Sequence, residues 1–104
     1  MKYTLIPASL ALAMASGASL AADAEQLLKD KACLSCHQLD KKLVGPAYKD
    51  VAAKYKPRKD AEAYLVSKIK GGSTGVWGPI PMPPNGTVND AEAHTLAKFI
   101  LTVK

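Results

Sequence analysis

The sequence predicts an all-α fold of about four helices, and three observations support this prediction. Apolar residues recur at i, i+3, i+4 and i+7 in several stretches, which is the spacing of one helix face. Capping residues or helix breakers bound most of these stretches, and no β-hairpin signal lies between them. The helices are expected in one small domain, residues 22–104, because the first 21 residues have a different character.

The first two helices are recognised by a cap and by a breaker. Asp23 and Gln26 have the spacing of a capping box, so the first helix should start there and run toward Cys33. The second helix is short, because Pro57 cannot continue it. Its apolar face has helical spacing and comprises Tyr48, Val51, Ala52 and Tyr55.

The last two helices have clear ends. The third should begin near Asp60 and finish at Gly71-Gly72, because glycine commonly terminates helices. It carries Tyr64, Leu65 and Ile69. The fourth should open at Asn89, with Glu92 three residues later as its capping partner. Its apolar face comprises Leu96, Phe99, Ile100 and Val103.

Residues 1–21 have the pattern of a secretory signal peptide. Lys2 supplies the positive charge, an apolar stretch follows, and Ser19-Leu20-Ala21 fits the small-x-small cleavage rule. We therefore expect cleavage after Ala21 and a soluble periplasmic protein, in which 83 of the 104 residues remain. The alternative is an uncleaved membrane anchor, since about twenty apolar residues can span a bilayer.

Charge narrows the class of partner. Without Lys2 the chain has 13 of its 14 basic residues against 9 acidic ones, a formal net charge of +4. A basic surface suits an acidic protein or nucleic acid. The lysines are spread along the chain without an interleaved aromatic run, so we expect no nucleic-acid binding.

The run Cys33-Leu34-Ser35-Cys36-His37 carries the chemistry. C-x-x-C-H is the attachment signature of a c-type haem. Two thiols three positions apart lie on one side of a helical turn, where they can form thioethers with both vinyl groups of one porphyrin. His37 can then approach the iron from the same side. We expect one covalently attached haem c, whose iron cycles between Fe2+ and Fe3+.

Other interpretations of these cysteines remain open. A thioredoxin-like pair also uses C-x-x-C, but within a βαβ pattern that is not evident in this sequence. A structural zinc site needs four ligands, and after cleavage the chain offers only Cys33, Cys36, His37 and His94. A plain disulfide would leave His37 unexplained.

The long segment from Gly71 to Thr87 should contain the second iron ligand. A loop of this length is usually functional, and its four prolines favour a stiff backbone. Trp77, Ile80 and Met82 are apolar and are expected to be buried. Met82 is the only methionine after residue 21 and stands between two prolines, so we expect it to ligate the iron. His94 is the rival, but lies off the apolar face of its helix.

Ligation by His37 and Met82 has a functional consequence. Both axial positions would be filled, and methionine raises the potential relative to two histidines. This predicts an electron-transfer protein and not an enzyme. The alternative is a haem enzyme or gas sensor whose methionine is displaceable.

Four segments together resemble the small bacterial class I cytochromes c of the c-551/c-552 type. They are the C-x-x-C-H run, Val44–Ala47, Gly75–Gly78 and the proline-methionine segment Pro79–Asn85. The resemblance covers essentially all of residues 22–104. It implies a compact fold of about four helices wrapped around one haem.

The resemblance also implies roles for individual residues. Cys33 and Cys36 would carry the thioethers, and His37 and Met82 would be the axial ligands. Three further residues would contact the cofactor or its ligands: the Pro46 carbonyl would accept a hydrogen bond from His37, the Trp77 indole would donate to a propionate, and Asn85 would bond near the methionine sulfur. Lys68 occupies a position near a propionate, where a lysine binds less specifically than an arginine.

The resemblance further implies how the protein would meet its partners. It would be a monomer that takes electrons from a membrane cytochrome complex and delivers them to a terminal reductase, oxidase or peroxidase. One haem edge would be exposed in an apolar patch with a rim of lysines, and contacts would be small and transient. The rim candidates are Lys31, Lys41, Lys42 and Lys49.

Overall fold

The computed structural model describes residues 16–104, which form four α-helices and one 3₁₀ turn. In chain order the elements are α1 (Ser16–Asp30), η1 (Cys33–Ser35), α2 (Tyr48–Tyr55), α3 (Ala61–Gly71) and α4 (Asp90–Ile100). Within this range there is no β-strand, only an isolated antiparallel bridge between Ser73 and Met82. The all-α prediction is confirmed. Most of the expected signal peptide, residues 1–15, lies outside the described residues.

The expected start of the first helix is wrong. α1 begins at Ser16 and passes through Asp23, which is therefore not a cap. The Gln26 side chain does not complete a capping box but donates to Asp30 Oδ1 at 2.9 Å. The reason is local propensity, because the alanines and Leu20 before Asp23 favour helix when they are part of the chain. α1 consequently runs through the expected cleavage position after Ala21.

The other three helices match their predicted positions. α2 buries the predicted face, and α3 follows Asp60 and ends at Gly71. The capping box of α4 is formed in both directions: Glu92 N–H donates to Asn89 Oδ1 at 2.8 Å, and Asn89 N–H donates to Glu92 Oε1 at 3.0 Å. α4 ends at Ile100, so Val103, which was expected on its apolar face, lies beyond the helix.

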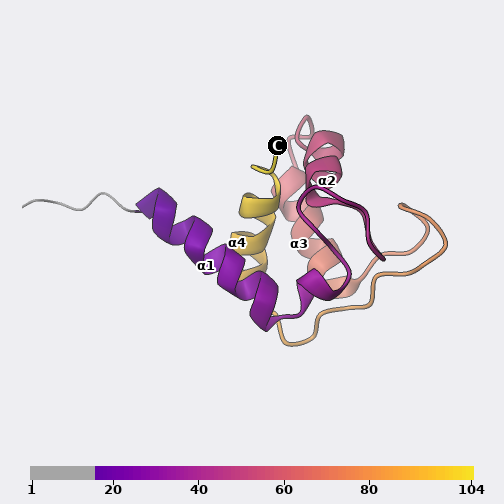
Figure 1. The fold of residues 1–104 in the computed structure, drawn as a ribbon, viewed down its shortest axis with the longest axis horizontal. Helices are drawn as coiled ribbons and strands as arrows, with labels where there is room; N and C mark the ends of the chain where they lie inside the picture. The colour runs from indigo at the N-terminus through magenta and orange to yellow at the C-terminus, as the bar shows by residue number, and fades with distance from the viewer. Residues whose placement is uncertain (1–15) are drawn as a thin grey trace, which may run out of the picture.

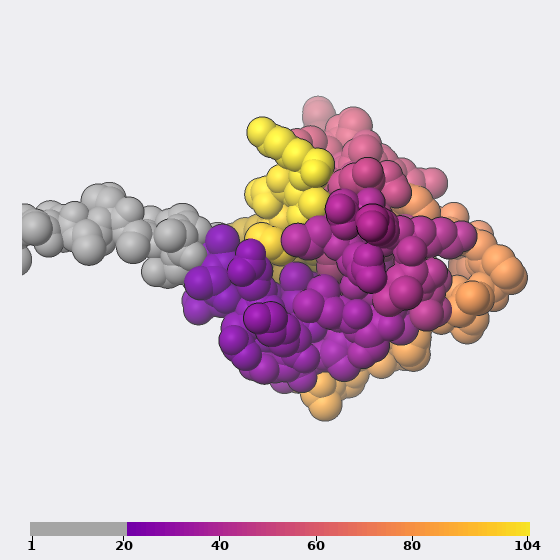
Figure 2. Space-filling model, viewed as in Figure 1, coloured from indigo at the N-terminus to yellow at the C-terminus, as the bar shows by residue number. Residues whose placement is uncertain are grey.

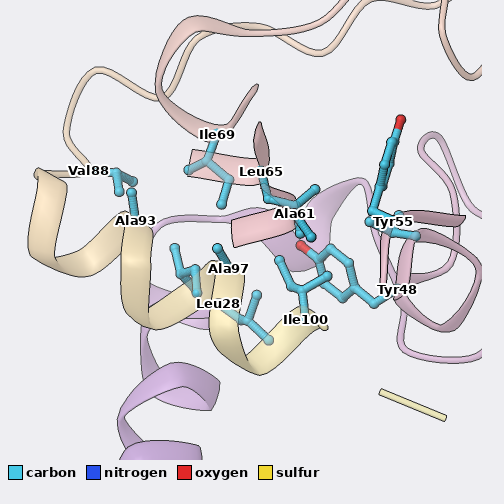
Figure 3. Close-up of a cluster of buried hydrophobic side chains, with 12 residues drawn as sticks. Leu28, Tyr48, Tyr55, Ala61, Leu65, Ile69, Val88, Ala93, Ala97 and Ile100 are labelled. Carbon is cyan, nitrogen blue, oxygen red and sulfur yellow. The ribbon is translucent and has the colours of Figure 1, made fainter. Parts of the chain in front are cut away.

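α4 is the centre of the helix packing, since α1, α2 and α3 all contact it (Figure 1). Small residues allow close approach: Ala24 on α1 and Ala93 and Ala97 on α4 have no exposed surface. Side chains of α3 and α4 turn toward one another in the core, as Figure 3 shows for Leu65 and Ala97. No helix within residues 16–104 is long and apolar enough to cross a lipid bilayer.

Two loops project from the same side of this helical frame. One joins η1 to α2, and the other joins α3 to α4 (Figure 1). Both loops extend on the side of the molecule opposite α1 (Figure 1), and residues of the second loop form that end of the surface in the space-filling view (Figure 2). The loops carry the sequence motifs, and the helices fix where the loops start and end.

The capping box gives a stability prediction. Asn89→Ala removes the acceptor for the Glu92 amide and should lower the free energy of unfolding by about 1 kcal/mol. Asn89→Asp keeps an equivalent acceptor and serves as the matched control, so it should stay close to the parent protein. Urea unfolding followed by circular dichroism measures both, and equal stability of the alanine variant and the parent would contradict the role of the cap.

Candidate functional site

One cavity of about 570 Å³ lies between the two loops and the helices. Every residue that the sequence analysis assigned to the site contributes to its wall. These residues are Cys33, Cys36, His37, Pro46, Trp77, Met82 and Asn85, and Lys68 joins them. Residues that are far apart in the chain are thus brought to a single site.

The two cysteines lie at opposite ends of a tight turn. α1 stops at Asp30, and Ala32 adopts a left-handed conformation with φ of 59°, which redirects the chain into η1. Cys36 N–H and His37 N–H both donate to Cys33 O, at 3.2 and 3.0 Å. Side chains three apart in a 3₁₀ turn lie above one another, so both thiols are presented on one side. The two sulfurs are not joined in a disulfide, and burial raises the pKa of the Cys33 thiol.

His37 is the buried polar side chain of the site, with 8% of its surface exposed. Its Nδ1 is 2.7 Å from the Pro46 carbonyl oxygen, which can only accept, so Nδ1 carries the proton. Nε2 is then the nitrogen with a lone pair available to a metal. Burial lowers the pKa of His37, against the opposing effect of the Pro46 bond, and so favours the neutral ring that ligates metals.

Two neighbours fix the plane of the His37 ring. The Tyr48 ring stacks on it, with centroids 4.7 Å apart and an angle of 17° between the planes. The Gly45 backbone approaches so closely that a Cβ at this position would lie 2.6 Å from His37 Cε1. Gly45 N–H also donates to Cys36 O at 2.7 Å, which binds the loop to the motif itself. Contacts within the protein chain alone therefore orient the imidazole.

Met82 enters the cavity from the second loop and is half-buried. Its backbone forms both hydrogen bonds of the bridge to Ser73: Met82 N–H donates to Ser73 O at 2.8 Å, and Ser73 N–H donates to Met82 O at 3.0 Å. The thioether is thus carried by an anchored stretch of backbone inside a long loop.

Asn85 connects the second loop to α3. Its Nδ2 donates to Ile69 O at 2.8 Å, and its backbone N–H reaches the same oxygen at 3.2 Å. The expected bond near the Met82 sulfur stays a prediction, because the Asn85 Nδ2 carries a second hydrogen. Ile69 lies in the last turn of α3, where helix carbonyls lack partners within the helix. Asn85 satisfies this carbonyl and joins the loop to α3.

The expected burial of Trp77 and Ile80 is wrong for the chain by itself. Their side chains are 37% and 63% exposed, because they line the cavity and its opening instead of packing into the helical core. Trp77 meets Tyr55 edge-on at 6.2 Å between centroids, and Lys54 Nζ lies 5.2 Å from the Trp77 centroid. The wall near Trp77 is thus aromatic and positively charged.

The sequence analysis missed several wall residues. Tyr48, Tyr55 and Leu65 were recognised only as apolar positions of helices, yet they also line the cavity. Helical spacing shows which face is buried but not what that face meets. For Tyr48 the sequence contains one sign that it lies at the site, because Tyr48 follows the Gly45-Pro46 segment by two residues.

The alternative zinc site finds no support in the described part of the chain. No group of three or more histidine, cysteine, aspartate or glutamate side chains within residues 16–104 could hold a metal ion. His94 lies on the exposed surface, where its Nδ1 is 2.6 Å from Glu62 Oε2, and it does not line the cavity.

The contact between Gly45 and His37 gives a second prediction. Gly45→Ala places a methyl group against the imidazole ring and should lower the free energy of unfolding by about 1–3 kcal/mol, as overpacking does. Gly86→Ala is the matched control, because a Cβ there meets nothing within 4 Å. Urea unfolding of both variants tests this, and equal stability of the two would refute the close contact.

Comparison with known proteins gives the family of this site. Residues 21–104 match the family model described as cytochrome c. The chain is 54% identical over 103 residues to cytochrome c-551 of Pseudomonas aeruginosa, covering 94% of this chain and 98% of that protein. It is 60% identical over 83 residues to cytochrome c-552 of Nitrosomonas europaea, covering 80% of each.

The fold agrees with the sequence match. The crystal structure of wild-type Nitrosomonas europaea cytochrome c552 superposes with a TM-score of 0.75 at 59% identity, covering 77% of this chain and 99% of that one. The fold, the C-x-x-C-H run and the sequence match agree. The chain therefore belongs to the cytochrome c family, the small electron carriers with one covalently attached c-type haem.

Proposed function

We propose that the protein is a soluble periplasmic carrier that transfers single electrons through a haem ligated by His37 and Met82. The observation that carries the proposal is the state of His37 in the shared cavity. Its Nδ1 is committed to Pro46 at 2.7 Å, which leaves Nε2 for iron. A bare thiol pair would not require such a buried and oriented imidazole.

The residues of the cavity fit a covalently bound haem. Cys33 and Cys36 are the proposed thioether positions, on one side of the η1 turn and next to His37. The bound haem supplies an iron that changes between two oxidation states one electron apart. The chain supplies attachment, orientation and an apolar surrounding, and such a haem would cover the parts of Trp77 and Ile80 that the chain leaves exposed.

Two side chains have proposed roles at the propionates. Trp77 would donate its indole N–H, and the charge of Lys54, whose Nζ lies 5.2 Å from the Trp77 centroid, favours an anionic group there. Lys68 also lines the cavity, with Nζ 5.3 Å from the Tyr64 centroid. For Asn85 the structure favours an indirect role, in which it anchors the loop of Met82 to Ile69.

Met82 decides between a carrier and the alternative function. A thioether on the sixth position would leave no site for dioxygen or peroxide, so electrons would pass through the haem edge without bond formation. A haem enzyme or gas sensor would need Met82 to leave. The bridge to Ser73 restrains Met82. This restraint favours the electron carrier over an enzyme or sensor that needs Met82 to leave.

The proposed location rests on the N-terminus. The cytochrome c match starts at residue 21, which leaves residues 1–20 outside it. These residues have the composition of a leader, with cleavage proposed after Ala21. We propose domain limits of 1–21 for the signal peptide and 22–104 for the cytochrome.

The proposed docking surface is the opening of the cavity. Four apolar side chains there are at least 39% exposed and also line the cavity: Leu43, Val44, Val76 and Ile80. We call these residues the apolar rim. A small exposed apolar surface suits transient contact with redox partners such as a membrane cytochrome complex and a terminal reductase, oxidase or peroxidase.

The structure changes the set of lysines proposed beside the apolar rim. Lys31 also lines the cavity, but its amine is already engaged, since Nζ donates to Thr87 O at 2.9 Å and lies 3.7 Å from Glu92 Oε1. Lys49 lines a separate hollow together with Lys56 and Lys104. Lys42 lines the cavity itself and is exposed. Lys42 is therefore the strongest candidate for attracting an acidic partner.

An absorption spectrum with an intact mass tests the main proposal. The exported protein should weigh as residues 22–104 plus one haem, and its oxidised form should show the near-infrared band of a thioether bound to iron. Met82→Ala should abolish that band and allow carbon monoxide to bind the reduced form. Absence of the band in the parent protein, together with ready carbon monoxide binding, would favour the enzyme or sensor instead.

Charge reversal tests the docking surface. Lys42→Glu should slow oxidation by the anion ferricyanide by about tenfold at low ionic strength, through lost electrostatic steering. Lys98→Glu makes the same change of net charge on α4, outside the cavity wall, and should have a smaller effect. Stopped-flow rates at low and high salt compare the two. Identical salt dependence in both variants would rule out steering at the cavity opening.

A further inference from the structure

The backbone of Met82 is fully paired, although it lies within a long loop. Its N–H and its carbonyl both bond to Ser73, at 2.8 and 3.0 Å. Ser73 follows the end of α3 by two residues, so Met82 is joined directly to the helical frame. Residues 74–81, between the two partners, are all exposed. The bridge thus separates an anchored Met82 from an exposed segment.

Gly72 allows this close pairing. Its φ of 84° and ψ of 175° lie in a region that is essentially restricted to glycine. A Cβ at Gly72 would lie 2.7 Å from Met82 O and 3.1 Å from Pro84 N. Any side chain here would therefore push the Met82 backbone away from α3. Gly71, one residue earlier, has open space around its Cβ position.

A second connection follows three residues after Met82. Asn85 donates to Ile69 O with both its backbone N–H and its side-chain Nδ2. Pro83 and Pro84 lie between the two connections and restrict the backbone there. Met82 cannot move outward as a loop residue normally would, because the chain is attached to α3 on both sides of this stiff segment.

We propose that the Gly72-Ser73 turn is a positioning element for Met82, and that it sets how easily an external ligand displaces the Met82 thioether. This inference rests on the proposed ligation by Met82. The turn acts through the backbone: it holds the Met82 peptide against α3, so a ligand that replaces the thioether must also open the bridge. Contact of a partner with the exposed residues 74–81 would leave Met82 in place.

Adjacent glycines provide the test. Gly72→Ala should strengthen apparent imidazole binding to the oxidised holoprotein by about tenfold, because loss of bridge hydrogen bonds weakens the hold on Met82. Its near-infrared thioether band should weaken in parallel. Gly71→Ala changes the same atoms one residue away and should bind imidazole like the parent. Equal imidazole affinity in the two variants would overturn the inference.

Hydrogen exchange on the unsubstituted holoprotein provides a second test, which holds even if Gly72→Ala fails to mature. The amides of Ser73 and Met82 should exchange slowly, and at least about tenfold faster once imidazole saturates the iron. The amide of Leu101, bonded to Ala97 O at 3.1 Å, is the internal control and should not change. Unchanged protection of Ser73 and Met82 would refute the inference. Absence of the thioether band in the parent would instead refute ligation by Met82.

Discussion

The hydrogen bond from His37 Nδ1 to the Pro46 carbonyl is the constraint on which the site depends. It selects the tautomer, and together with the Tyr48 ring it fixes the plane of the imidazole. Because only Ala47 separates Pro46 from α2, the orientation of His37 is tied to the position of that helix. Gly45 leaves room for the ring at a place where any Cβ would collide with it. The proposed ligand is thus held by backbone atoms of a loop that the helices hold in turn.

The second proposed ligand, Met82, is also held by hydrogen bonds of a loop, in this case to the end of a different helix. Met82 is attached through Ser73 and Asn85 to the end of α3, and α3 packs on α4. An electron carrier benefits from such rigidity, because a site that changes little between oxidation states needs little reorganisation. The exposed apolar rim and residues 74–81 can then meet partners while the ligands remain fixed. Two loops provide the chemistry, and the helices determine how far apart the loops lie.

The differences from the sequence-based expectations have local physical causes. α1 extends N-terminal to Asp23 because the alanines and Leu20 before Asp23 are good helix formers. Trp77 and Ile80 are exposed although they are apolar. Hydropathy indicates that an apolar side chain needs cover, but it does not show whether protein or another group provides that cover. In each case the pattern indicated a tendency, and a neighbour that was unknown from the sequence decided the outcome.

The sequence by itself determined the helical class, three of the four helices and the cofactor. Capping residues, glycines and prolines act within a few positions, and the spacing of Cys33, Cys36 and His37 is itself the attachment signature. Only the tertiary structure decided that Tyr48 stacks on His37, that Ser73 pairs with Met82 and that Lys31 is engaged by Glu92. Lys31 and Glu92 lie far apart in the chain, and Ser73 and Met82 lie at separate points of one long loop. The orientation of Tyr48 toward His37 depends on how α2 docks, and no periodic pattern encodes such a contact.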